Sequence, residues 1–130
     1  MDIDFEVYVT LVPIFADKNY YQADPNYYKI LLTKDKKILK KRLTLSTTIE
    51  DTLLDLYDEY LKIDREWTFK TLYNCKKTNN SIDITYICKM PYIEDCEKDG
   101  VFVNINDFMS TITDEYYVKI VTSNSPESFR

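Results

Sequence analysis

One stretch of the chain, residues 47–63, limits most strongly what the rest can fold into. Thr47 and Glu50 have the spacing of a capping box, in which two side chains satisfy backbone amides at the start of a helix. Projected as a helix, the stretch gathers its apolar side chains on one face and its acidic ones on the other. The apolar face consists of Ile49, Leu53, Leu56, Tyr57, Tyr60 and Ile63. The sequence therefore predicts one long amphipathic helix, which needs an apolar layer to pack against.

That layer is predicted to be a β-sheet, because β-favouring segments lie on both sides of the helix. Residues 5–14 alternate apolar and polar side chains, as a strand does, and we expect this strand to end or bulge at Pro13. Residues 27–33 and 38–45 form a predicted hairpin with a charged, lysine-rich turn.

The second half of the chain repeats this strand-rich character. Residues 67–75 and 82–90 form a second predicted hairpin that turns about Asn79 and Asn80. This pairing places Cys75 opposite the region of Ile84 and Thr85 rather than opposite Cys88. The pattern therefore predicts no disulfide within this hairpin.

The C-terminal part of the sequence is less regular. An acidic loop at 91–100 leads to a short predicted strand at 101–105 and a helical turn at 107–111, capped by Asn106 or Asp107. Residues 114–122 permit either a strand or a helix, because their side chains favour strands while their spacing suits a helix.

The length and composition place the chain among small single-domain proteins. Its 130 residues suffice for one compact domain, which we assign to residues 1–122, with a flexible tail at 123–130. No apolar stretch approaches the length of a membrane span, and the start is acidic, so we expect a cytoplasmic protein. The abundance of Lys and Tyr is typical of AT-rich genomes such as those of many phages. A phage-encoded protein would act in the host cytoplasm or in the virion.

The absence of histidine and the presence of a single glycine, Gly100, exclude several chemistries. Without histidine there is no Ser-His-Asp or Cys-His nucleophile and no histidine-ligated zinc. Glycine-rich phosphate loops need several glycines where the backbone approaches the phosphate. Any catalysis would have to use carboxylates, lysine, tyrosine or a thiol.

The order of the predicted elements resembles the Nudix fold over roughly residues 5–122. The resemblance implies an α+β fold, an α/β/α sandwich with a mixed β-sheet, one long helix near residues 47–63 and a short C-terminal helix. The Nudix box reads G-x5-E-x7-R-E-U-x-E-E-x-G-U, where U is a bulky aliphatic residue. In that family the glutamates of the box hold a divalent metal on the diphosphate of the substrate.

The acidic helix fits the box in two registers that differ by one residue. In the first register, Asp55, Asp58 and Glu59 take the metal-binding positions. Their spacing puts the carboxylates on one side of a helix, as an oxygen-liking cation such as Mg²⁺ requires. In the second register only Glu59 remains, because Leu56 and Tyr60 take the other two positions.

Both registers lose parts of the box that support catalysis. In the first, Lys40 and Leu61 replace the two glycines, and Leu54 replaces the arginine that orients the glutamates. We therefore expect a catalytically inactive domain without a cofactor, acting as a binding or structural component of a larger assembly, such as that of a phage. The alternative is a divergent Mg-dependent Nudix hydrolase of nucleoside diphosphate derivatives, with Asp55, Asp58 and Glu59 as its catalytic and metal-binding residues.

Two further sets of side chains are candidates for binding. Tyrosine is enriched at protein interfaces, and the predicted protein-binding set is Tyr20, Tyr21, Tyr27, Tyr28, Tyr116 and Tyr117. The candidates for phosphate or nucleic acid are Lys36, Lys37, Lys40, Lys41 and Arg42, which could equally be a charged hairpin that resists aggregation. Because the net charge is −5, we expect a protein partner rather than nucleic acid, and no membrane.

Overall fold

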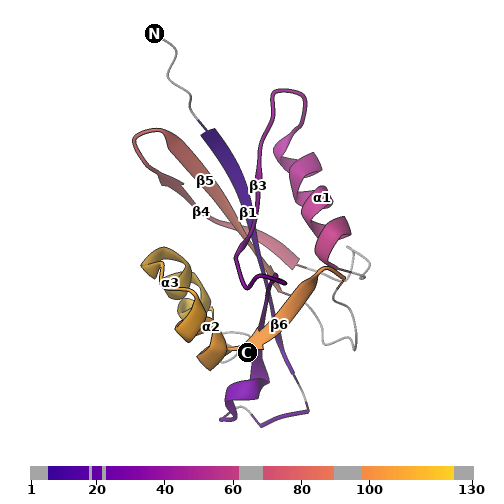
Figure 1. Cartoon of the computed structure of the whole chain (residues 1–130), viewed down its shortest axis with the longest axis vertical. Helices are drawn as coiled ribbons and strands as arrows, with labels where there is room; N and C mark the ends of the chain where they lie inside the picture. Colours follow the sequence, from indigo (N-terminus) through magenta and orange to yellow (C-terminus); the bar gives the residue numbers. More distant parts are fainter. Residues whose placement is uncertain (1–5, 18, 22, 62–68, 90–97, 125–130) are drawn as a thin grey trace.

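The computed structural model describes residues 6–17, 19–21, 23–61, 69–89 and 98–124 as a sheet between helices. The sheet is mixed and six-stranded, with the order β4-β5-β1-β2-β6, and β3 pairs with β1 off this path. Helix α1 lies on one side of the sheet and α2 and α3 on the other (Figure 1). This arrangement confirms the predicted α+β sandwich. The strands are β1 Glu6–Ala16, β2 Tyr28–Thr33, β3 Leu39–Arg42, β4 Phe69–Lys77, β5 Ser81–Lys89 and β6 Gly100–Asn104.

Strand β1 is the centre of the sheet, and two strands share one of its edges. β5 runs parallel to β1 along one edge, from Glu6 opposite Ser81 to Ile14 opposite Lys89. Along the other edge, β3 pairs with residues 8–11 and β2 with residues 14–16, both antiparallel.

The first predicted hairpin is therefore wrong in its pairing. β2 and β3 are joined by a tight turn, in which the amide of Lys36 donates to the carbonyl of Thr33 over 2.8 Å. However, both strands pair with β1 instead of with each other. β1 also continues through Pro13 rather than ending there. Pro13 lies where the partner on one edge changes from β3 to β2, so the ladder is already interrupted beside it.

The second predicted hairpin is confirmed. β4 and β5 pair antiparallel, and Cys75 lies opposite Ile84 as expected. The register shifts between Leu72 and Asn74, which marks a β-bulge on the edge strand. Residues 67, 68 and 90 of the predicted hairpin lie outside the described residues.

The N-cap of helix α1, Ile49–Tyr60, lies one residue later than predicted, and residues 62 and 63 of the predicted helix lie outside the described residues. Its N-cap is Thr48, whose hydroxyl accepts from the amide of Asp51, while the Asp51 carboxylate accepts from the amide of Thr48. Thr47 is instead part of the preceding turn, where its amide donates to the carbonyl of Thr44. A capping box is present, but it uses Thr48 and Asp51 rather than Thr47 and Glu50.

The ambiguous C-terminal segment is helical. Helix α2, Ile105–Thr111, is capped by Asn104, which precedes both predicted caps, Asn106 and Asp107, and α3, Glu115–Ser123, is capped by Asp114. The β-favouring side chains of α3 recur at helical spacing, so Tyr117, Ile120 and Val121 are buried together. Of the predicted tail at 123–130, Ser123 is the last residue of α3 and residues 125–130 lie outside the described residues, as do residues 91–97 of the predicted acidic loop.

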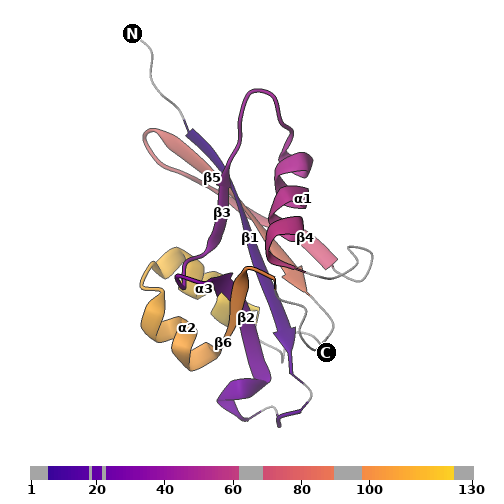
Figure 2. The same cartoon turned by 45° about the vertical axis from the view of Figure 1, so that its right-hand side comes forward.

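The alternation of β1 builds two cores, one on each face of the sheet. Val9, Leu11 and Phe15 pack with α1, and Val12 and Ile14 pack with α2 and α3. Both helical layers therefore depend on one strand, and Figure 2 shows that strand passing between them.

Gly100 fills a place that no side chain can occupy. A Cβ at this position would lie 2.7 Å from Leu31 Cδ1 and 2.8 Å from the backbone oxygen of Leu32. We expect Gly100→Ala to lower the free energy of unfolding by about 1–3 kcal/mol, because β2 or β6 must shift to admit the methyl group. Urea denaturation of this variant and of Asp99→Ala, an exposed neighbour, measures the difference. Equal stability of the two variants would contradict the close packing.

Candidate functional site

The three carboxylates predicted to bind metal lie exposed on α1. Asp55, Asp58 and Glu59 all point to the solvent side of the helix, whereas Leu56 is buried with 1% exposure. The first register gives Leu56 the apolar position of the box, while the second would make this buried side chain a metal ligand. The burial of Leu56 therefore favours the register with Asp55, Asp58 and Glu59.

Lysines from outside the helix interact with this acidic surface. The Lys41 ammonium, from β3, lies 3.1 Å from an Asp55 carboxylate oxygen. The Lys98 ammonium donates over 3.1 Å to the backbone carbonyl of Asp58. Since α1 has no basic residue in its last turn, Lys98 supplies the positive charge that favours a helix C-terminus.

The positions of the two box glycines have different backbone roles in this chain. Lys40 lies within β3, opposite Thr10 of β1. Leu61 follows the last turn of α1 with φ −128° and ψ 138°, an extended conformation, and only 5% of it is exposed. Neither residue forms the positive-φ turn that a glycine would favour.

The carboxylates of α1 do not assemble a complete metal site by themselves. In the described ranges, no group of three His, Cys, Asp or Glu side chains is arranged to hold a metal ion. An ammonium already neutralises Asp55. Mg²⁺ requires near-octahedral oxygen ligands and is usually held by one or two carboxylates together with water and substrate phosphates.

The predicted basic cluster is divided between the two faces of the sheet. Because side chains alternate along β3, Lys40 and Arg42 lie on the face of α3, and Lys41 lies on the face of α1. Arg42 is 3.6 Å from Glu6, and Lys40 is 3.3 Å from Asp83. Lys36 and Lys37 are exposed in the turn before β3.

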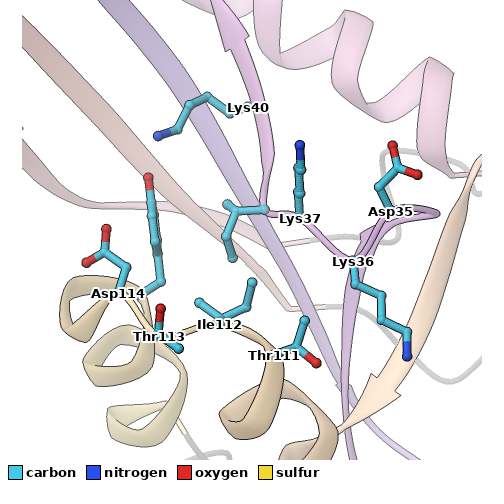
Figure 3. A pocket seen from close by; sticks show the side chains of 10 residues that line it. Asp35, Lys36, Lys37, Lys40, Thr111, Ile112, Thr113 and Asp114 are labelled. Carbon is cyan, nitrogen blue, oxygen red and sulfur yellow. The ribbon is translucent and has the colours of Figure 1, made fainter.

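A cavity of about 640 Å³ brings Lys36, Lys37 and Lys40 together with the C-terminal helices. One wall is the β2–β3 turn with the start of β3, and the other is the connection between α2 and α3 (Figure 3). Lys37 and Lys40 stand on the first wall, while Lys36 extends in the opposite direction from Lys37. The lining consists of Asp35, Lys36, Lys37, Ile38, Lys40, Thr111, Ile112, Thr113, Asp114 and Tyr117.

Beside the cavity lies a buried polar network centred on Asp83. Its carboxylate accepts from the Thr10 hydroxyl over 2.7 Å and from the Thr85 hydroxyl over 3.1 Å. The Tyr117 hydroxyl donates to its other oxygen, and Lys40 completes the set as an ion pair. The Lys40 ammonium also lies 5.2 Å from the centre of the Tyr117 ring. This network joins β1, β3, β5 and α3, so it fixes one wall of the cavity.

The tyrosines predicted to bind protein do not form one surface. Tyr28 and Tyr117 are buried, with 5% and 6% exposure, and their hydroxyls donate to Val121 and Asp83. These two residues belong to the core on the side of α2 and α3. Tyr116 and Tyr27 are half-buried. Tyr20 and Tyr21 are exposed, at 40% and 89%, in the loop between β1 and β2.

Asp83 was not among the predicted site residues, although the sequence contains a signal for it. On β5, Asp83 and Thr85 alternate with Ile82, Ile84 and Tyr86. Such a carboxylate on a strand suggests a solvated face, and the sequence alone does not show that α3 covers this face. Asp114 was missed for a similar reason, since its helix was ambiguous.

Comparisons with solved structures identify the fold. A MutT protein studied from Aliivibrio salmonicida and Vibrio cholerae matches with a TM-score of 0.63 and 14% identity, over 92% of this chain and 97% of that chain. The Caenorhabditis elegans Ap4A hydrolase matches with a TM-score of 0.62 and 8% identity, over 91% and 94% of the two chains.

A third match is the Nudix domain of Shewanella oneidensis NrtR, solved with ADP ribose, with a TM-score of 0.58 and 12% identity over 91% and 84% of the two chains. No family model and no curated protein sequence matches the chain. The chain therefore has the Nudix fold, which the similarity establishes without establishing an activity. Within the described residues, no helix is long and apolar enough to cross a membrane.

The two buried tyrosines make the fold sensitive to alkaline pH. Burial raises the pKa of Tyr28, and burial together with the hydrogen bond to Asp83 raises the pKa of Tyr117, both well above the usual 10.0. The unfolded chain loses these protons near pH 10, whereas the folded protein retains them. The two tyrosines therefore contribute fully to the free energy of unfolding below pH 10, and this contribution is lost as the pH rises above 10.

We expect the free energy of unfolding to fall by up to about 1.4 kcal/mol per pH unit above pH 10 for each of these tyrosines. Tyr28→Phe should reduce this slope, and Tyr21→Phe, at an exposed position, is the matched control. Urea denaturation between about pH 9 and 11.5 measures both slopes. The same alkaline slope in Tyr28→Phe and the wild-type protein would contradict the assignment.

Proposed function

We propose that this chain is a catalytically inactive Nudix-fold domain that acts in the cytoplasm, or in a virion, as a binding or structural component of a protein assembly. The proposal rests on an ion pair on the acidic helix α1. The carboxylate of Asp55, which the box would use for metal, is paired with the ammonium of Lys41 at 3.1 Å.

The residues at the two box-glycine positions also support the proposal that the domain is catalytically inactive. Lys40 and Leu61, at the positions of the box glycines, are integral to a strand and to the core. Restoring a glycine turn at Leu61 would remove a buried side chain from the cluster that holds α1. The chain therefore has structural reasons to keep residues that a Nudix hydrolase would not have.

A hydrolysis assay tests the proposal. The purified protein, incubated with Mg²⁺ or Mn²⁺ and a panel of nucleoside diphosphate derivatives, should release no product above the background without protein. If turnover appears, Glu59→Gln and Asp58→Asn decide its origin, with Asp107→Asn as the matched control on α2. Turnover that is lost in the first two variants and retained in the third would establish the alternative, a divergent Mg-dependent Nudix hydrolase.

The cavity beside α3 favours a second candidate function, the binding of a small anionic ligand. Its lining combines Lys36, Lys37 and Lys40 with the apolar side chains of Ile38 and Ile112, and it also includes Asp35 and Asp114. An apolar floor with cationic groups on one wall suits a ligand with a ring and a phosphate. The similar NrtR domain was solved with ADP ribose, a ligand of this chemistry.

Isothermal titration with ADP-ribose tests the cavity. We expect Lys37→Ala to weaken binding by about tenfold, the usual cost of losing one hydrogen bond to a charged group. Lys41→Ala is the matched control, because it removes a lysine of the same segment that does not line the cavity. Absence of binding to the wild-type protein, or equal loss in both variants, would reject the cavity as the site.

A further inference from the structure

The turn between β2 and β3 contains a residue in an unfavourable backbone conformation. Lys36 has a φ of 60°, the only positive φ among the described residues. Its amide donates to the Thr33 carbonyl, and the amide of Thr33 donates to the Lys37 carbonyl over 2.9 Å. A loop in which a four-residue turn is followed by one left-handed residue is a common way to join neighbouring strands. The left-handed conformation therefore belongs to the turn, and the sequence decides which side chain occupies it.

Lysine is a poor choice for this position on structural grounds alone. A Cβ in the left-handed region crowds the backbone, so glycine is the usual residue there and asparagine the next best. Asparagine is available to this chain, which has Asn79 and Asn80 between β4 and β5. A side chain held in a strained backbone conformation suggests a function for that side chain.

Lys36 also retains an unpaired charge. Within the described residues, neither Lys36 nor its neighbour Lys37 takes part in an ion pair, and both are exposed. The other basic side chains of residues 34–42 are each paired with a carboxylate: Lys34 with Asp99, Lys40 with Asp83, Lys41 with Asp55 and Arg42 with Glu6.

The cavity beside α3 contains charged groups that are already balanced. Lys40 lies 3.3 Å from Asp83 of the buried network. Asp114, on the opposite wall, lies 3.9 Å from Lys76 and accepts from the amide of Tyr116 as the N-cap of α3. These two lining residues therefore add little net charge to the cavity.

The remaining charges of the lining all come from the β2–β3 turn. They belong to Lys36, Lys37 and Asp35, and Asp35 has no ion pair among the described residues either. One carboxylate offsets one of the two ammonium groups. Lys36 thus leaves the lining with a net positive charge, and without it Lys37 and Asp35 would cancel.

We propose that Lys36 makes the cavity beside α3 selective for anionic ligands, and that this lysine is kept in the turn although it lowers the stability of the fold. The inference rests on the proposed binding of a small anionic ligand in the cavity. A lysine ammonium binds phosphate as a point charge with three donors. Figure 3 shows Lys36 leaving the turn in the opposite direction from Lys37, so the two cations reach different parts of a bound ligand.

Lys36→Gly should make the protein more stable, in contrast to most substitutions. Glycine relieves the strain, and its greater freedom in the unfolded chain offsets part of the gain, so the equilibrium constant for unfolding should fall by about threefold. Lys34→Gly is the matched control, because Lys34 lies in the same turn, has no positive φ and does not line the cavity. This control should raise the unfolding constant, and urea denaturation measures both changes.

The same variants should differ in the opposite sense in ligand binding. Isothermal titration with ADP-ribose should show that Lys36→Gly weakens binding by about tenfold, the usual loss for one hydrogen bond to a charged group. Lys34→Gly should bind as the wild-type protein does.

Two further variants separate the charge of Lys36 from its backbone. Lys36→Arg keeps a cation in the strained position, so it should resemble the wild-type protein in both stability and affinity. Lys36→Asn suits the turn and is neutral, so it should weaken binding as Lys36→Gly does.

Two results would overturn the role of Lys36 while leaving the proposed function intact. These are a Lys36→Gly variant that binds ADP-ribose as tightly as the wild-type protein, and a Lys36→Gly variant destabilised as much as Lys34→Gly. A wild-type protein that does not bind ADP-ribose would instead reject the cavity as the site, and the role of Lys36 with it.

Discussion

The structure depends on strand β1, which is buried on both faces and paired along both edges. Its odd-numbered apolar residues hold α1, and its even-numbered residues hold α2 and α3. One edge carries β5, while β3 and β2 divide the other between them. This division turns the link between β2 and β3 toward the C-terminal helices, where it forms a wall of the cavity beside α3. The central strand therefore determines both the layers and the position of the cavity.

Much of the fold could be predicted from local patterns. The amphipathic period of α1 and the alternation of β5 are properties of neighbouring residues, and these elements are confirmed. The pairing of β3 could not be predicted. Residues 28–42 show two β-favouring segments joined by a turn, and this local pattern is the same whether β2 and β3 pair with each other or each pairs with β1. The helical state of α3 depended on burial of Tyr117, which is a contact with residues far away in the chain.

The sequence identified many of the charged residues of the candidate sites, but it did not show which of them lie close together. The lysines near residue 40 were identified, yet alternation along β3 sends Lys41 to the acidic helix and Lys40 to Asp83. The acidic stretch of α1 was identified too, but nothing in its spacing reveals that lysines from β3 and from residue 98 reach it. Charged side chains in a sequence thus indicate how much charge must be balanced, while the fold decides which groups balance it.

The position of α2 and α3 in the chain affects how folding can proceed during synthesis. These helices cover Val12, Ile14 and Ile30, which belong to strands made much earlier. Until the residues of α3 leave the ribosome, one side of the sheet remains exposed and Asp83 lacks its tyrosine partner. Stepwise folding from the N-terminus would therefore expose an apolar sheet to other chains. Folding late and cooperatively, once α3 is available, avoids that hazard.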